Sequence, residues 1–372
     1  MTRFYESVTK RDECALYELR SLYRRYGYAQ YKMSKFEEYD LYVRNKSFLL
    51  SDHVITFTDT DGKLMALKPD VTLSIVKNSK DAVEGVRKVY YNENVYRVPK
   101  GELSFREIMQ TGLECIGNID TYCIAEVLIL AAKSLEVLSP DYVLDISHLG
   151  VVSALIDRLG VSEAARQQIL QCVGEKNPYG IDGICAAEGI NPEKASSLKR
   201  LVTADGNCER MLELLAEADC GEAAKELGNI LSAVRESVSE DRIRLDFSVV
   251  NDMNYYNGIV FGGFINGVPT SILSGGQYDN LMRKMGKQSG AIGFAVYLDL
   301  LDRLYNESES YDADVVVVYE SDADAALVCR TVNALTADGK RVAVRRTMPT
   351  KLRYKQLITV KSGEVSIVEE RA

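Results

Sequence analysis

Residues 105–117 read FREIMQTGLECIG and contain one basic, one amide and one acidic side chain at intervals of four residues. If this stretch is a strand, Arg106, Gln110 and Glu114 share one face, because side chains alternate across a strand. The opposite face is apolar. An unpaired buried carboxylate is costly, so the polar face needs either water or a ligand. An amide and a carboxylate are suited to bind an ammonium group or a ring N–H.

The polar face belongs to a predicted hairpin. Residues typical of strands run from Lys88 to Arg97 and from Phe105 to Gly117, and Pro99-Lys100-Gly101 interrupts them. This pattern is typical of two antiparallel strands joined by a longer loop. From the hairpin alone, two interpretations of the polar face stay open: a solvated sheet surface, or one wall of a ligand site.

Residues 54–77 predict a hairpin, in which Asp61-Gly62 supplies the tight turn between alternating strands. A second polar group, the run Lys68-Pro69-Asp70-Val71-Thr72, follows those strands. Thr72 has two interpretations that the sequence leaves equally open. Its hydroxyl caps a helix over residues 73–79, or it contacts a ligand together with Asp70.

Tyrosines and glycines gather in residues 253–279. Tyr255 and Tyr256 precede a predicted strand, and the run Gly275-Gly276-Gln277-Tyr278-Asp279 follows it. Glycines allow a backbone to approach a ligand closely. The alternative is a glycine-rich meander whose tyrosines belong to the core.

The elements that carry these groups also have signals in the sequence. Apolar residues at helical spacing predict helices over residues 9–27 and 121–137. Residues 142–147 predict a buried strand, and residues 150–159 predict a helix after it. His148, between the two, is interpreted as a structural residue.

Residues 160–240 change character, because Ala, Glu, Lys and Leu dominate and glycines interrupt a helical period. They predict a helical insertion. Residues 311–372 predict a small α/β module of strand, helix, strand and hairpin. We therefore expect an α+β protein with two domains: a core over residues 1–310 that contains the insertion, and the C-terminal module.

Composition limits the class of protein. With 372 residues, 46% of them hydrophobic, the chain can bury a substantial core. Its net charge of −9 opposes non-specific nucleic-acid binding, which depends on Lys and Arg at phosphates. The eight cysteines form no Cys-x-x-Cys pair and there are two histidines, so we expect no metal site and no cofactor. Without an apolar run of membrane-spanning length or a signal peptide, the chain is expected to be cytoplasmic.

The polar hairpin resembles the second signature motif of class II aminoacyl-tRNA synthetases in its histidyl form. In that family the arginine that matches Arg97 holds the ATP α-phosphate and the substrate carboxylate. The residues that match Gln110 and Glu114 contact histidine. The run from Lys68 to Thr72 resembles the family element whose acidic residue and threonine receive the α-amino group of histidine.

Other motifs that resemble those of the family occur in the same order along this chain as in the family. Residues 253–261 resemble the histidine-specific motif, whose tyrosine at the position of Tyr256 closes over the imidazole ring. Residues 275–279 resemble the family's Gly-Gly-Arg-Tyr-Asp, with Gln277 in place of arginine. Residues 32–44 stand where class II synthetases carry their first motif, a dimer-forming helix and strand, and a plain surface helix is the alternative. The resemblance implies a class II synthetase-like antiparallel sheet flanked by helices, and a histidine-like pocket lined by Asp70, Thr72, Arg97, Gln110, Glu114, Tyr255 and Tyr256.

The chain departs from the synthetases where they handle ATP. Asn251 stands at the position of a catalytic arginine, and Tyr297 and Leu300 stand where the family has glycine and arginine. Removing one group that stabilises developing negative charge slows a reaction roughly 10²- to 10³-fold. Losing two independent groups would therefore cost roughly 10⁴- to 10⁶-fold. We expect a protein without synthetase chemistry and without catalytic residues.

The run from Asp145 to Gly150 resembles the regulatory subunits of ATP phosphoribosyltransferase, which are paralogues of histidyl-tRNA synthetase. That resemblance implies a non-catalytic protein that supports a short-form catalytic subunit in the first step of histidine biosynthesis and mediates feedback by histidine. It implies a self-dimer within a hetero-oligomer, L-histidine as ligand, and no membrane or nucleic-acid partner. With Asn251 in place of arginine, the carboxylate of histidine loses a partner, which lowers the expected affinity. A divergent histidyl-tRNA ligase and a stand-alone histidine-binding sensor are the alternatives. The C-terminal module resembles a truncated anticodon-binding domain.

Overall fold

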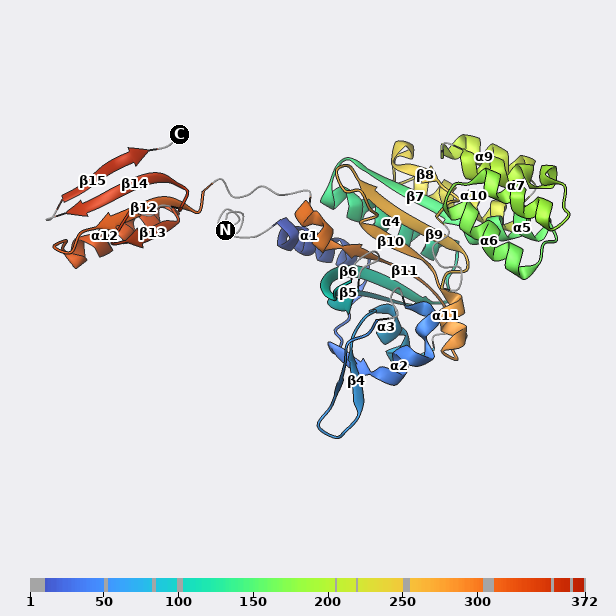
Figure 1. The fold of residues 1–372 in the computed structure, drawn as a ribbon, viewed down its shortest axis with the longest axis horizontal. Coiled ribbons are helices and arrows are strands. Elements are labelled where there is room, and N and C mark those ends of the chain that lie inside the picture. The colour runs from blue at the N-terminus through green and yellow to red at the C-terminus, as the bar shows by residue number, and fades with distance from the viewer. Residues whose placement is uncertain are drawn as a thin grey trace. The chain divides into compact units, whose positions relative to one another are not determined.

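The chain divides into two compact units, Met1–Leu304 and Tyr305–Ala372 (Figure 1). The computed structural model describes residues 11–49, 53–81, 85–98, 103–204, 206–218, 220–249, 255–303, 311–348, 351–361 and 364–370. Asn251 and the Pro99-Lys100-Gly101 break, both singled out in the sequence, lie outside these residues.

The larger unit is built around a mixed sheet that has eight strands within the described residues. Across the sheet they follow the order β1 (Ala29–Gln30), β5 (Val86–Arg97), β6 (Arg106–Gly117), β11 (Gly290–Tyr297), β10 (Leu273–Gln277), β9 (Ile259–Ile265), β7 (Tyr142–His148) and β8 (Ile243–Leu245). The inner pairs are antiparallel, and the parallel pairs β1/β5 and β7/β8 lie at the two edges. The predicted hairpin is the long pair β5/β6.

Two helices cover one face of this sheet. α4 (Thr121–Leu138) begins where the side chain of Asp120 accepts a hydrogen bond from the amide of Cys123 at 2.8 Å. α1 (Arg11–Arg25) packs beside it, and the hydroxyl of Tyr23 lies 3.1 Å from that of Ser134. The Tyr23 ring also contacts the ring of Phe294 on β11, with centroids 6.1 Å apart. Both helices follow the apolar spacing that predicted them.

A small three-stranded sheet precedes the β5/β6 hairpin. Its strands are β2 (Phe36–Glu38), β4 (Leu64–Leu67) and β3 (Thr56–Thr58), in that order. The predicted turn at Asp61-Gly62 joins β3 to β4, and Gly62 has φ 85°. Residues 32–44 contain β2 followed by α2 (Tyr39–Arg44), so the alternative of a plain surface helix is wrong. The 3₁₀-helix η1 (Lys46–Phe48) follows α2, and α3 (Thr72–Asn78) follows β4.

The predicted insertion is helical. It contains α6 (Glu163–Gly174), α7 (Pro178–Ala187), η2 (Pro192–Ala195), α8 (Ser196–Thr203), α9 (Cys208–Glu217), α10 (Gly221–Arg235) and η3 (Glu240–Arg242). α5 (Leu149–Asp157) leads into it from β7. His148 Nδ1 accepts from the amide of Gly150 at 3.1 Å, and Nε2 lies 3.3 Å from a Glu226 oxygen, which agrees with a structural role.

The smaller unit is a four-stranded sheet, as far as the structure describes it, in the order β13 (Val342–Arg345), β12 (Ala313–Tyr319), β14 (Tyr354–Lys361) and β15 (Glu364–Glu370). α12 (Ala325–Ala337) joins β12 to β13, and these two strands are parallel. The order of strand, helix, strand and hairpin is the predicted one. None of the helices in the described part of the chain has the length and hydropathy needed to span a membrane.

Candidate functional site

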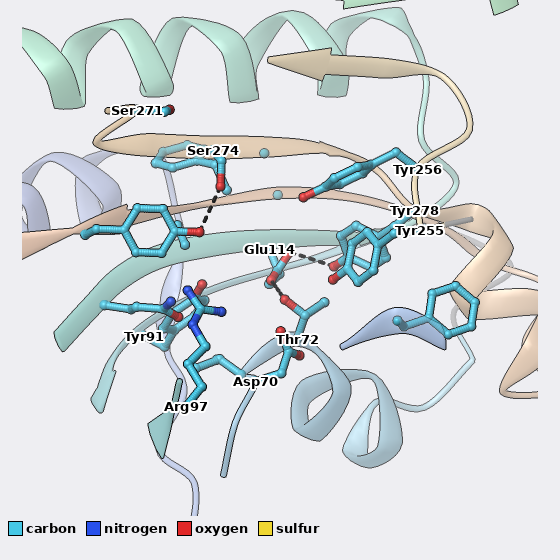
Figure 2. A pocket seen from close by; sticks show the side chains of 18 residues that line it. Asp70, Thr72, Tyr91, Arg97, Glu114, Tyr255, Tyr256, Ser271, Ser274 and Tyr278 are labelled. Atoms are coloured by element: carbon cyan, nitrogen blue, oxygen red, sulfur yellow. Dashed lines mark hydrogen bonds between the residues drawn. The ribbon is translucent and has the colours of Figure 1, made fainter. Parts of the chain in front are cut away.

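A cavity of about 370 Å³ opens within the larger unit, on the sheet face formed by β6, β10 and β11 (Figure 2). Small-molecule sites commonly have volumes of roughly 300–1,000 Å³. All residues predicted for the histidine-like pocket line this cavity: Asp70, Thr72, Arg97, Gln110, Glu114, Tyr255 and Tyr256. The structure thus brings together residues that lie far apart in the chain, and their contacts with a ligand stay a prediction.

Glu114 lies in the middle of β6 and provides a buried carboxyl group. Its partner on β11 is Gly293, where a Cβ atom would collide with the Glu114 carboxylate. The residue is 1% exposed. The hydroxyl of Thr72 donates to Oε1 at 2.7 Å, and the hydroxyl of Tyr278 donates to Oε2 at 2.6 Å. The interpretation of this strand face as a solvated sheet surface is therefore wrong.

The environment of Glu114 favours its neutral form. Burial raises the pKa of Glu114 to about 8, although the hydrogen bonds from Tyr278 and Thr72 favour the ionised form. The nearby charge of Asp70 raises the pKa further. The carboxyl group can therefore change its protonation state near neutral pH when a charged ligand arrives.

The loop before α3 supplies Asp70 and Thr72. Oδ1 of Asp70 accepts a hydrogen bond from the amide of Leu73 at 2.8 Å, so the aspartate satisfies the first turn of the helix. The interpretation of Thr72 as the cap is wrong, because its hydroxyl donates to Glu114 instead. Burial raises the pKa of Asp70, and the Leu73 amide and the positive charge of Arg97 oppose that rise.

Arg97, the last residue of β5, provides the positive charge of the cavity. Its guanidinium carbon lies 5.7 Å from the centroid of the Tyr297 ring, and the hydroxyl of Tyr297 lies 2.9 Å from that of Ser274. Arg97 is 9% exposed and forms no ion pair with a carboxylate in the described ranges. A buried guanidinium without such a partner is suited to bind a carboxylate or a phosphate, because an unpaired buried charge is costly.

Aromatic side chains form another wall of the cavity. The ring of Tyr255 packs edge-on against Tyr256 with centroids 4.6 Å apart, and against Phe48 at 5.8 Å. The rings of Tyr255 and Tyr278 are also 5.8 Å apart. Burial raises the pKa of both Tyr255 and Tyr278 well above the usual value, so their hydroxyls stay protonated. Aromatic faces beside carboxyl groups are suited to a flat or cationic group.

Comparisons with known proteins place this chain in a family. A sequence model of the family described as Histidyl-tRNA synthetase matches residues 4–301. An ATP phosphoribosyltransferase regulatory subunit from Clostridium kluyveri is 30% identical over 322 residues, which cover 81% of each chain. This chain belongs to the histidyl-tRNA synthetase family, in the group of ATP phosphoribosyltransferase regulatory subunits.

Solved structures of this family share the fold. A Bacillus halodurans protein described as an ATP phosphoribosyltransferase regulatory subunit/histidyl-tRNA synthetase has a TM-score of 0.73 and 23% identity, and the match covers 95% of each chain. A chain of the ATP phosphoribosyl transferase (HisG:HisZ) complex from Thermotoga maritima has a TM-score of 0.61 and 18% identity, with 77% of this chain and 97% of that chain covered. The predicted α+β, class II synthetase-like fold is confirmed.

This family member also lines its cavity with residues that the sequence did not assign to the site: Phe48, Val71, Tyr91, Ser271, Ser274, Gly275, Tyr278, Gly293, Phe294, Ala295 and Tyr297. Tyr278 had a signal, because it stands in the Gly-Gly-Gln-Tyr-Asp run. Ser274 and Tyr91 had none, since a single serine or tyrosine in a strand is common in a sheet.

The departures from the synthetases have different positions in the structure. Tyr297 lines the cavity beside Arg97. Leu300 lies in the 3₁₀-helix η4 (Leu298–Arg303) and is not among the lining residues. Lys68, the first residue of the Lys68-Pro69-Asp70-Val71-Thr72 run, is fully buried and forms an ion pair with Glu93 at 2.8 Å. No group of metal-ligating side chains was found among the described residues.

Proposed function

We propose that this chain is a non-catalytic regulatory subunit that supports the catalytic subunit of ATP phosphoribosyltransferase, in the first step of histidine biosynthesis, and mediates feedback by histidine. Its membership in the group of regulatory subunits supports this role. The chemistry of the cavity supports the absence of synthetase activity and the presence of an amino-acid site.

The observation that carries the proposal is the distribution of charge around the cavity. Asp70 and Glu114 supply two carboxyl groups, and Arg97 is the one cationic side chain among the lining residues that the structure describes. Formation of an adenylate builds negative charge on a phosphate, and placed cations stabilise that charge. A cavity with one cation and two carboxyl groups favours a zwitterionic amino acid over a nucleoside triphosphate.

Histidine fits these groups by charge and by hydrogen-bonding capacity. Arg97 would bind the α-carboxylate, since a guanidinium pairs with a carboxylate through two parallel hydrogen bonds. Asp70 and Gln110 would accept hydrogen bonds from the α-ammonium group. Glu114 would accept from an imidazole N–H, and Tyr256 would pack against the ring.

The protein partner is proposed on the same basis. A structural neighbour comes from a complex whose description pairs two kinds of subunit. We infer a hetero-oligomer in which a self-dimer of this chain joins a short-form catalytic subunit. In this proposal the site binds histidine and performs no covalent or metal chemistry. Histidine would therefore act on the catalytic subunit through its binding alone.

Calorimetric titration tests the site and the partnership together. The purified chain is titrated with histidine alone and with the catalytic subunit from the same genome. We expect saturable binding that Arg97→Ala weakens and Arg106→Ala does not, because Arg106 is exposed on the same hairpin and does not line the cavity. Equal binding by both variants would contradict the site, and no association with the catalytic subunit would contradict the partnership.

The family model also supports a second candidate, a divergent histidyl-tRNA ligase. Pyrophosphate exchange that depends on both histidine and ATP would establish the ligase and exclude the non-catalytic role. Affinity capture from native lysate separates the third candidate, a stand-alone histidine sensor. Recovery of a phosphoribosyltransferase chain supports the regulatory subunit, and histidine binding without that chain supports the sensor.

A further inference from the structure

The hydrogen bonds at Glu114 are suited to a negatively charged carboxylate. Thr72 donates to Oε1 at 2.7 Å and Tyr278 donates to Oε2 at 2.6 Å, so each oxygen faces one hydroxyl group (Figure 2). A hydrogen bond to an ionised acceptor is roughly twice as strong as one between neutral groups. Both hydroxyls therefore stabilise the ionised form of Glu114 more than its neutral form.

The protein does not balance such a charge with a cation. Glu114 is 1% exposed, and no ion pair joins it to a Lys, Arg or His side chain within the described ranges. Arg97, the one cationic side chain among the described lining residues, has its guanidinium carbon 5.7 Å from the centroid of the Tyr297 ring. A buried carboxylate without a cation is costly, so the ligand-free carboxyl group keeps its proton. Burial raises the pKa of Glu114 to about 8, which agrees with that state.

The side chains around Glu114 favour a positive group beside it. The centroid of the Tyr255 ring lies 4.6 Å from that of Tyr256 and 5.8 Å from that of Tyr278. Aromatic faces attract cations. Asp70 adds a second carboxyl group, whose charge opposes the ionisation of Glu114 and attracts a cation. This part of the cavity therefore suits an ion pair whose anion is Glu114 and whose cation comes from the ligand.

We propose that the side-chain ring of the ligand takes the proton of Glu114, so that the site selects an amino acid whose ring is a weak base. This inference rests on the proposed histidine site and names the chemical class of its ligand. The O–H bond of the Glu114 carboxyl group breaks, and an N–H bond forms at the unprotonated nitrogen of a neutral imidazole. The products are an imidazolium and a carboxylate, and no proton is exchanged with solvent.

The transfer improves the contacts on both sides of the new ion pair. Afterwards Thr72 and Tyr278 both donate to an ionised acceptor, and the ring cation lies among tyrosine rings and near Asp70. An ion pair inside a cavity is also stronger than one in water, because the local dielectric constant is lower. A ring that is not a base leaves the carboxyl group neutral and gains none of these interactions. The site therefore discriminates by basicity as well as by shape.

Other titratable groups also face this part of the cavity. They are Asp70 from the loop before α3, Tyr91 on β5, Tyr255, Tyr256 and Tyr278, with Arg97 at the end of β5. Burial raises the pKa of Tyr91, Tyr255 and Tyr278 well above the usual value, so these hydroxyls stay protonated. Burial also raises the pKa of Asp70, so Asp70 contributes on the acid side of the profile.

The shared proton predicts an affinity that is highest near neutral pH. Below the pKa of a free imidazole, roughly 6.5, the ligand brings its own proton and one must be released. Above the pKa of Glu114, about 8, the site has lost the proton that the ring needs. We expect histidine to bind about tenfold more weakly near pH 5.5 and about threefold more weakly near pH 8.5 than near pH 7.

Calorimetric titration of the full chain in buffers of different ionisation enthalpy measures the protons exchanged. We expect almost none near pH 7, release of about one near pH 5.5 and uptake of most of one near pH 8.5. Nuclear magnetic resonance of bound histidine with ¹⁵N in its ring locates the proton. Near pH 7.5 both ring nitrogens should have the shifts of an imidazolium, although the free ligand is neutral there.

A histidine analogue tests the basicity of the ring separately from its shape. 1,2,4-Triazolylalanine has a ring of the same size with an N–H group, but this ring is a much weaker base. We expect it to bind roughly 10- to 100-fold more weakly than histidine near pH 7, because a hydrogen bond to a charged group is replaced by one between neutral groups.

Two tyrosine variants test the support that the hydroxyls give to the carboxylate. Tyr278→Phe removes the donor to Oε2, so it should weaken histidine binding and shift the alkaline fall in affinity to higher pH. Tyr122→Phe is the matched control, because the Tyr122 hydroxyl also donates to a glutamate, Glu126, at 2.8 Å but does not line the cavity. It should leave the affinity and its pH profile unchanged. If Tyr278→Phe does not fold, the measurements on the wild-type chain decide.

The failure of this inference is distinguishable from the failure of the proposed function. A bound ring with the shifts of a neutral imidazole, or a triazole analogue that binds as tightly as histidine, would overturn the proton transfer and leave the histidine site intact. Absence of histidine binding at every pH would overturn the proposed site and the proton transfer together.

Discussion

Replacing Glu114 with glutamine is expected to stabilise the ligand-free protein above pH 8 and to change its stability little near pH 5. Burial raises the pKa of Glu114 from the usual 4.5 to about 8. The unfolded chain releases this proton near pH 4.5, whereas the folded protein keeps it until about pH 8. Between these values the folded state binds more protons, so its stability falls as the pH rises. Glutamine does not titrate, so the variant avoids that loss.

The size of this stability difference follows from the gap between the two pKa values of Glu114. One pKa unit corresponds to about 1.4 kcal/mol, so a rise from 4.5 to about 8 corresponds to about 5 kcal/mol of stability lost by the wild type. We expect the difference in unfolding free energy between variant and wild type to grow with pH and to approach several kcal/mol by about pH 9. The hydroxyls of Thr72 and Tyr278 can rotate to donate to or accept from the new amide, so the side chain keeps its partners.

Urea unfolding followed by far-ultraviolet circular dichroism measures this difference, since the chain contains no tryptophan. Glu107→Gln is the control on the same strand. Hydrogen bonds from Asn94 and Tyr96 lower the pKa of Glu107, so its replacement should give no stabilisation at high pH. A difference between Glu114→Gln and wild type that stays constant from about pH 5 to about pH 9 would refute the reasoning.

Further variants test other parts of the cavity and its support. Arg97→Ala should weaken histidine binding roughly 10- to 100-fold in calorimetry, because a hydrogen bond to a charged group contributes about 1.5–3 kcal/mol; unchanged affinity would remove Arg97 from the site. Gly293→Ala should lower the melting temperature and abolish histidine binding, because the new Cβ atom would collide with the buried carboxylate of Glu114. Gly228→Ala is the control: it lies in the middle of α10 with open space around it, and should stabilise the fold by about 0.5–1 kcal/mol. Lys68→Met should cost about 3–5 kcal/mol in urea unfolding by leaving Glu93 without its partner, and a neutral effect would show that the pair is dispensable.

Local patterns determined much of the fold. The hairpins, the helices on the sheet and the helical insertion follow from alternation, helical spacing and turn residues such as Asp61-Gly62. These signals are visible in the sequence because they depend on neighbouring residues. The same alternation placed Gln110 and Glu114 on one strand face, and the resemblance to a family supplied the other residues expected beside them.

The state of each candidate residue depended on contacts between distant parts of the chain. The Glu114 carboxylate lies in the space that Gly293 leaves free on the neighbouring strand β11, and its donors Thr72 and Tyr278 are 42 and 164 residues away. The sequence alone left Thr72 equally suited to cap a helix, since a hydroxyl can serve either purpose. The stacking of Tyr297 on Arg97 likewise joins two strand ends that are separated by two hundred residues. Burial, pKa and hydrogen-bond partners depend on which residues meet in space, so only the tertiary structure decided them.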